Sequence, residues 1–306
     1  MNIVNVIDAM AEAEENRFPR YDKVHHYARD FLKRKDEDTL VGMCVRENWY
    51  SWMKVGNTDM AVKSLYNFKG GRMWENEIAH LLEQYPGWSV ERERPVMIHP
   101  EALKYAIKGK IDFVLRSPDG KETILVELKT THGRAMTNKF FGVKYKGPKD
   151  DHVMQLSYYF AHADGGIDLH FKECKEKDKA LLAEMKLLDK KDPRRKSLRK
   201  HRRTLREELA RPKECKPTEA ILLYFSREDF FRLQFSTSGD GLPLDLIEMN
   251  DVRCFVYLEK FIEERKIPPR TFDDPKKFPC SYCFHKTRCY EVDGDNSFDE
   301  ESMGEE

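Results

Sequence analysis

The chain has 306 residues, of which 40% are hydrophobic and 35% are charged, with equal numbers of basic and acidic residues. This balance excludes fibrous and disordered classes and is typical of a globular protein with a highly charged surface. The N-terminus has neither a basic n-region nor a continuous apolar h-region, and the sequence has no apolar run of about 18 residues, so we expect an intracellular, cytoplasmic protein with no membrane partner. The zero net charge conceals a basic segment from Lys190 to Arg206 and an acidic one from Glu291 to the end.

The first ninety residues have mostly helical periodicity. Apolar residues recur at spacings of three and four between Val24 and Leu32, through Tyr27, and again between Ile78 and Leu82. We expect Gly70 and Gly71 to break the pattern between these two helices.

Strands follow the turn at Pro86-Gly87. Residues 88–98, 108–117 and 121–131 have strand character, and the turn over residues 117–121 joins the last two as a hairpin. A short helix is expected over residues 151–163, and a charged two-helix insertion over 172–216. Two more strands, 219–229 and 230–235, precede an amphipathic helix over 251–266.

Three charged residues interrupt the apolar strands. Asp112 lies in one strand, and Glu127 and Lys129 flank Leu128 in the next, so strand alternation places Glu127 and Lys129 on one face. Two carboxylates beside a lysine supply oxygen ligands for Mg²⁺ or Mn²⁺ and a cation near a scissile phosphate. A solvated cross-strand ion pair is the simpler alternative, but carboxylates inside apolar strands are costly to bury without a metal or a partner.

These residues, followed by Gln155 and Tyr159 spaced as Q-x-x-x-Y, resemble the PD-(D/E)XK nuclease core of the RecB type. The resemblance implies an α/β, restriction-endonuclease-like fold, in which a central mixed sheet is flanked by helices. It also implies a hydrolase that cleaves phosphodiester bonds in DNA. Gln155 and Tyr159 share one helix face, where they would contact the substrate backbone or orient the Lys129 strand.

In this family a helix led by a glycine supplies one more metal ligand, usually a histidine or glutamate four residues after the glycine. Glu75 stands at that distance from Gly71, whereas His80, the more usual residue type, lies five residues further on. Residues five apart point about 140° away from each other on a helix, so both cannot face one metal, and Glu75 is preferred. The resemblance therefore implies catalytic residues Glu75, Asp112, Glu127, Lys129, Gln155 and Tyr159, and metal ligands Glu75, Asp112, Glu127 and Leu128.

Seven cysteines are present, and three of them, Cys280, Cys283 and Cys289, lie within ten residues. Such crowding indicates metal ligation more than disulfides, and a fourth ligand is needed. His285 would complete a Cys₃His zinc site, and a fourth cysteine would complete an iron-sulfur site. RecB-like nucleases of the AddB and CRISPR adaptation kind carry this three-cysteine tail and one upstream cysteine, so the resemblance implies a 4Fe-4S cluster with Cys44 as the fourth ligand. Ordinary packing is expected for the remaining cysteines, Cys174, Cys215 and Cys254.

The cluster would join N- and C-terminal helical additions around one RecB-like nuclease domain over residues 1–290. Its expected parts are an N-terminal helical part (1–70), the nuclease core (71–171 and 217–262), the charged insertion (172–216) and the cysteine motif (263–290), followed by a disordered acidic tail (291–306).

The resemblance implies DNA as the partner, either single-stranded or at ends, and exonuclease action. It does not decide whether the protein works alone, beside a helicase in recombination or repair, in CRISPR adaptation, or for a virus. The alternative is a catalytically inactive nucleic-acid-binding or scaffold protein that retains the nuclease fold and a structural zinc site or iron-sulfur cluster.

Overall fold

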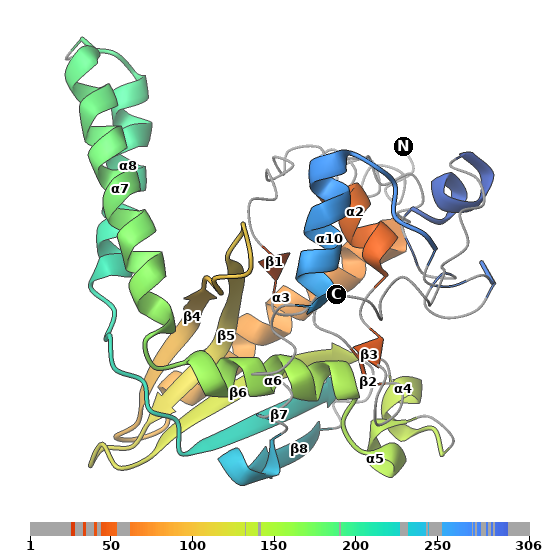
Figure 1. The fold of residues 1–306 in the computed structure, drawn as a ribbon. Helices are drawn as coiled ribbons and strands as arrows, with labels where there is room; N and C mark the ends of the chain where they lie inside the picture. Colours follow the sequence, from red (N-terminus) through yellow and green to blue (C-terminus); the bar gives the residue numbers. More distant parts are fainter. Residues whose placement is uncertain are drawn as a thin grey trace, which may run out of the picture.

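The computed structural model describes most of the chain between residues 26 and 292 (Figure 1). The described residues are 26–27, 33–34, 40–41, 44–53, 62–131, 133–139, 142–189, 191–226, 232–242, 244, 253–270, 272, 274–276, 280, 283 and 285–292. Almost all of the acidic tail therefore lies outside the described residues. No helix in the described part is both long enough and apolar enough to cross a membrane.

A mixed sheet forms the centre of the fold. Its main strands run in the order β4-β5-β6-β7-β8, with antiparallel pairing except between β6 and β7, which are parallel. A two-residue strand, β1 (His26–Tyr27), pairs in parallel with the first residues of β5. The predicted mixed sheet and all five of its main strands are thus confirmed: β4 (Ser89–Ile98), β5 (Ile107–Arg116), β6 (Thr123–Thr131), β7 (Glu219–Ser226) and β8 (Arg232–Thr237).

Helices cover both faces of this sheet (Figure 1). On one face, α6 (Asp150–His162) contributes Leu156 and Tyr158 to an apolar cluster with Leu125 of β6. On the other, α3 (Val62–Glu83) contributes Ala79 to a cluster with Val126 and Leu128 of the same strand. Successive β6 residues therefore serve two cores, as the alternation of side chains in a strand requires. Two short helices, α4 (Gly133–Thr137) and α5 (Val143–Lys146), connect β6 to α6.

Two expectations for the first ninety residues are wrong. Helix α3 continues through Gly70 and Gly71 without a break, because packing on the sheet stabilises a helix interior that glycine alone disfavours. A Cβ atom at Gly71 would lie 3.3 Å from Thr130 Oγ1, so the glycine lets α3 approach β6 closely. Tyr27, expected in a helix, lies in strand β1 and pairs with Lys108. A further two-stranded sheet joins β2 (Lys33–Arg34) to β3 (Leu40–Val41).

The charged insertion is a helical hairpin, which we call the arm. It consists of α7 (Gly166–Leu187) and α8 (Arg194–Leu209), and it projects away from the sheet (Figure 1). The predicted pair of helices around Asp192-Pro193 is confirmed, but the first helix begins six residues before the expected boundary at residue 172.

The N- and C-terminal additions meet on one side of the molecule. Helix α2 (Val45–Trp52) packs against α10 (Arg253–Glu264), and Trp49, Tyr50 and Trp52 share an apolar cluster with Leu258 and Cys289. A π-helical turn, η4 (Arg288–Val292), carries Cys289, and a 3-10 turn, η2 (Gly239–Gly241), follows β8.

Candidate active site and cysteine pocket

The candidate active site lies where β5 and β6 separate. The two strands pair from Arg116 opposite Thr123 as far as Phe113 opposite Val126. Beyond this point Asp112 Oδ2 accepts a hydrogen bond of 2.7 Å from the backbone N–H of Leu128. A carboxylate thus satisfies a backbone donor that the partner strand no longer reaches, which holds Asp112 against the β6 residues.

Glu127 and Lys129 lie on one face of β6, as the alternation predicts. Lys129 Nζ lies 2.6 Å from Glu127 Oε1 and donates a second hydrogen bond of 2.8 Å to Gln155 Oε1 on α6. Gln155 Nε2 in turn donates to the hydroxyl of Tyr159 at 2.9 Å, and this hydroxyl accepts from the backbone N–H of Lys110 at 3.3 Å. These hydrogen bonds link β6, α6 and β5, so the four polar side chains form one continuous network.

Glu75 approaches the same site from α3. It is half-buried, and its pKa is raised by burial and then by the negative charge of Glu93. Its own charge raises the pKa of both Asp112 and Glu127, so the three carboxylates share one electrostatic environment. His80 is exposed and forms a hydrogen bond of 2.7 Å with Gln84 on the helix surface. The structure therefore brings Glu75, and not His80, to the strand carboxylates.

Burial dominates the electrostatics of the site. It raises the pKa of Asp112 well above its usual value, and the adjacent Glu127 raises it further. Burial also raises the pKa of Glu127, against the opposing effect of the Lys129 ammonium group. The second oxygen of Glu127, Oε2, is buried and has no hydrogen-bond partner in the part of the chain that the structure describes. Buried carboxylates in this condition are stabilised by a cation, so the donor set fits a hard divalent metal.

The carboxylates are not already arranged as a coordination sphere. In the part of the chain that the structure describes, no three His, Cys, Asp or Glu side chains stand close enough together to hold a metal ion. Lys129 instead lies against Glu127 Oε1 and takes one of the positions that a ligand would need. Leu128, counted as a ligand from the sequence, points its side chain into the α3 cluster and donates its N–H to Asp112.

Glu93 is a neighbour of the site that the sequence did not reveal. Its φ of 47° is in the left-handed region, and the pairing of β4 with β5 skips it between Arg92 and Arg94. Its carboxylate lies 3.3 Å from Lys110 Nζ, and its charge acts on Glu75. In the sequence, the only indication of this neighbour is the alternation of charges over residues 91–94, which an ordinary exposed strand would also show.

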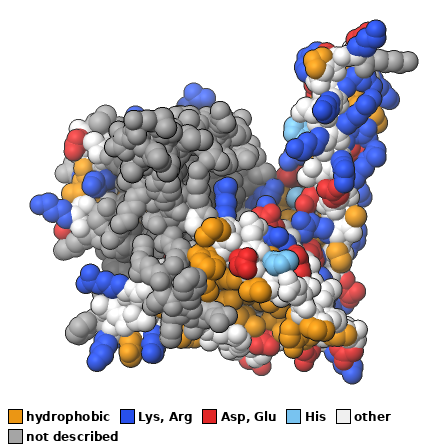
Figure 2. Space-filling view, turned by 180° about the vertical axis from the view of Figure 1, so that it is seen from behind, with side chains coloured by type: hydrophobic (Ala, Val, Ile, Leu, Met, Phe, Trp, Pro, Cys, Tyr) orange, Lys and Arg blue, Asp and Glu red, His pale blue; other side chains and the backbone are white. Residues whose placement is uncertain are grey.

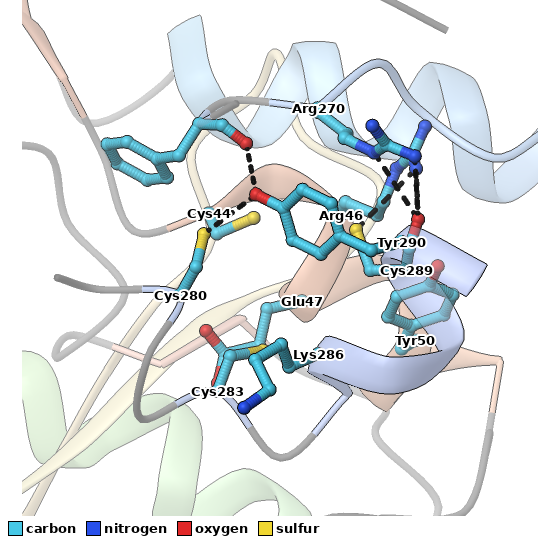
Figure 3. Close-up of a pocket in the computed structure, with 11 residues that line it drawn as sticks. Cys44, Arg46, Glu47, Tyr50, Arg270, Cys280, Cys283, Lys286, Cys289 and Tyr290 are labelled. Carbon is cyan, nitrogen blue, oxygen red and sulfur yellow. Dashed lines mark hydrogen bonds between the residues drawn. The ribbon is translucent and has the colours of Figure 1, made fainter. Parts of the chain in front are cut away.

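The second cluster of predicted residues lies between the two ends of the fold. Cys44, Cys280, Cys283 and Cys289 all line one pocket (Figure 3). Burial raises the pKa of the Cys283 thiol to about 12, and the charges of Glu47, Cys44 and Cys280 also raise it. The six cysteines whose side chains are described form no disulfides.

Hydrogen-bond donors surround these sulfurs. The hydroxyl of Tyr290 lies 3.3 Å from Cys280 Sγ, the backbone N–H of His285 lies 3.4 Å from Cys283 Sγ, and Arg46 Nη1 lies 3.6 Å from Cys289 Sγ. Arg46 is fully buried, and its Nη2 has no hydrogen-bond partner among the described residues. A buried cation beside several thiols makes the pocket suited to a negatively charged occupant.

Cys174, Cys215 and the ring of His285 do not line this pocket. His285 is 2% exposed and packs its ring against Tyr50 at 5.0 Å, and it is not among the residues that line the pocket. Cys174 and Cys215 are buried thiols whose pKa is raised by burial, in agreement with a packing role. The side chain of Cys254 lies outside the described residues.

Comparisons with known proteins identify the fold. A family model described as the PD-(D/E)XK nuclease superfamily matches residues 22–290. Eight chains of solved structures match, among them one described as "Crystal structure of SSO0001", with 15% sequence identity, a TM-score of 0.49, and coverage of 95% of this chain and 97% of that chain. No curated protein sequence matches.

Proposed function

Because the chain belongs to the PD-(D/E)XK nuclease superfamily, whose members are usually nucleases that use Mg²⁺ or Mn²⁺, we propose that it is a metal-dependent deoxyribonuclease. The observation that supports this most is that Glu75, Asp112 and Glu127 act on one another electrostatically beside Lys129, while Glu127 Oε2 is buried with no partner among the described residues. A protein that had lost catalysis would not need to keep these charges in a buried position, where each is costly.

Glu75, Asp112, Glu127 and the main chain at Leu128 would hold the metal. A bound divalent ion would supply a water activated for attack and charge neutralisation at the phosphate. Asp112 is fixed in position by its bond to Leu128, and Glu127 by Lys129. The first contact reduces the rearrangement that Asp112 needs when a metal binds, whereas Lys129 must move away from Glu127 Oε1 to admit the metal.

Lys129 would act on the substrate when a metal takes its place beside Glu127. Its ammonium group would then remain hydrogen bonded to Gln155 and lie near the attacking water and the scissile phosphate, where it stabilises developing negative charge. Gln155 and Tyr159 orient this lysine through their shared hydrogen bond. Their position on α6 also suits contact with the substrate backbone.

We further propose that the protein is of the RecB-like type and carries a 4Fe-4S cluster held by Cys44, Cys280, Cys283 and Cys289. The four cysteines line one pocket, and the buried Arg46 offsets the negative charge of thiolate ligands. Such a cluster would join α2 to the C-terminal segment. A zinc site with His285 is less well supported, because the ring of His285 packs on Tyr50.

On the same resemblance, we propose single-stranded DNA or DNA ends as the substrate and exonucleolytic cleavage as the activity. The setting could be recombination or repair beside a helicase, CRISPR adaptation, or viral DNA processing.

A cleavage assay with one isosteric variant tests the proposed function. Asp112→Asn keeps an acceptor for the Leu128 N–H but removes the charge, whereas Asp240→Asn changes an exposed aspartate on the η2 turn. With Mn²⁺ and labelled single-stranded and duplex DNA, the parent and Asp240→Asn should cleave and Asp112→Asn should not. Cleavage by Asp112→Asn at the parental rate would contradict the site, and no cleavage by parent protein that binds Mn²⁺ would contradict the function.

A further inference from the structure

The arm carries its excess of positive charge on one helix. Helix α7 has five acidic and five basic residues, whereas α8 has eight basic and two acidic residues. Figure 2 shows lysine and arginine side chains gathered along the projecting arm. The nuclease site as proposed uses none of them.

Helix α8 has two distinct faces. Leu198 is buried and Arg202 binds Asp178 of α7 at 2.7 Å, so this face packs on α7. The other face carries five exposed residues that we call the basic stripe: Lys196, Arg199, Lys200, Arg203 and Arg206. By helical geometry the stripe covers an arc of about 120° and a length of about 15 Å.

Most of the stripe is not neutralised. Glu207 lies in the same arc and pairs with Arg203 at 2.9 Å. Among the described residues, Lys196, Arg199, Lys200 and Arg206 have no carboxylate within 4.0 Å. An exposed helix that only needed solubility would be expected to mix both signs of charge, as α7 does.

The base of the arm is fixed to the strand that borders the site. Arg211, just after α8, donates to the backbone carbonyl of Arg92 at 2.7 Å and pairs with Glu208 at 2.9 Å. Arg94 is fully buried and donates to the carbonyls of Pro212 and Lys213 at 2.7 Å and 2.6 Å. These contacts attach the arm to β4 on either side of Glu93, which acts on Glu75.

We propose that the basic stripe binds the phosphodiester backbone of nucleic acid that leads to the active site. This inference rests on the proposed function. Phosphates follow each other about every 3.4 Å along one strand of a duplex, so a stripe of about 15 Å spans several of them. Lysine and arginine side chains on such a line make contacts that depend on charge and not on base sequence.

Binding measurements over a range of salt concentrations test the inference. All proteins carry Asp112→Asn so that DNA stays intact, and fluorescence anisotropy follows a blunt duplex and an oligothymidine strand. The stripe variant has Lys196→Gln, Arg199→Gln, Lys200→Gln and Arg206→Gln. The control loses the same charge at four exposed lysines outside the arm: Lys121→Gln, Lys216→Gln, Lys260→Gln and Lys266→Gln.

The stripe variant should flatten the plot of log Kd against log salt by about 0.9 for each lost duplex contact, or about 0.7 for each lost single-strand contact. A change on the duplex alone identifies duplex as the source of the phosphates, and a change on oligothymidine alone identifies single strands. Thermal unfolding checks that the variants are folded, which we expect because the four side chains point outward. An unchanged slope, or the same loss in the control, would overturn the inference. If the wild-type protein still cleaves DNA in that case, the proposed nuclease function stands without the stripe.

Discussion

Asp112 ties β5 to β6 through its 2.7 Å hydrogen bond to the Leu128 backbone at the position where the two strands stop pairing. The same carboxylate is the central ligand of the proposed metal site. Its structural role and its electrostatic role can be separated, because an asparagine keeps the acceptor and loses the charge.

The Asp112→Asn variant should be more stable than the parent at neutral pH without divalent metal. Burial and Glu127 raise the pKa of Asp112 well above its usual 3.8. Below pH 3.8 the Asp112 carboxyl is protonated in both the folded and the unfolded chain, so its charge makes no difference to the free energy of unfolding of the two proteins. As the pH rises, the unfolded chain ionises first, so the parent loses stability until the folded pKa is passed. We expect a gain of about 1–3 kcal/mol for the variant near pH 7 and none near pH 3.

Thermal unfolding in a chelating buffer at several pH values measures this difference. Adding Mn²⁺ should raise the Tm of the parent and leave that of Asp112→Asn nearly unchanged, since binding to the folded state stabilises it. A variant less stable than the parent at neutral pH would contradict the electrostatic account.

Replacing Lys129 by methionine should impair cleavage more than metal binding. The change removes the ammonium group between Glu127 and Gln155 but leaves all proposed ligands in place. We expect kcat to fall by about two to three orders of magnitude, as for loss of one group that stabilises developing charge. Single-turnover cleavage and Mn²⁺ titration by thermal shift measure the two properties. The control Lys121→Met, on the exposed hairpin turn, should change neither property. Equal losses in kcat and Mn²⁺ affinity for Lys129→Met would contradict this role and show that the lysine mainly stabilises the metal site.

Cys283→Ser should abolish the iron-sulfur absorption of protein purified without oxygen. The thiol pKa of about 12 means that cluster assembly must release protons, so loading should weaken as the pH falls. Cys174→Ser is the control, since that thiol is buried, has a raised pKa as Cys283 does, and lies on the arm. Iron, sulfide and zinc are measured in the parent and in the two variants. Zinc in a colourless parent protein would show a structural zinc site in place of the cluster. An iron content in Cys283→Ser equal to that of the parent would show that Cys283 is not a ligand.

Gly71→Ala should lower activity while changing stability little. Alanine is favoured in a helix by about 1 kcal/mol over glycine, but its Cβ would lie 3.3 Å from Thr130 Oγ1. Relief of this contact should move α3 outward by a few tenths of an ångström and Glu75, one turn along, with it. We expect an increase in the Mn²⁺ concentration needed for half-maximal cleavage, and rescue by adding Thr130→Ala. Failure of the second change to restore the Mn²⁺ response would rule out this contact as the cause.

Sequence patterns predicted the sheet and the contacts within it because these depend on short-range periodicity. Alternation in β6 placed Glu127 beside Lys129, and the four-residue spacing of Gln155 and Tyr159 placed them in contact on α6. The turn after β5 was also evident, and the N–H of Gly120 closes it onto the carbonyl of Ser117.

Features that depend on distant packing could not be predicted. Gly71 inside α3 packs closely against a strand about sixty residues later in the sequence, and helix propensity does not include such a contact. The left-handed conformation of Glu93 interrupts the pairing of β4 with β5 for one residue, and a charged residue in a strand does not mark that position. The two-residue strand β1 is too short to show an alternation of its own.

Of the three carboxylates, Asp112 and Glu127 belong to the sheet, whereas Glu75 belongs to α3. The spacing of the proposed metal ligands is consequently set by how closely α3 packs on β6, and this distance depends on the absence of a side chain at Gly71. Evolution or protein engineering could therefore adjust the metal preference of such an enzyme at a position that touches neither metal nor DNA.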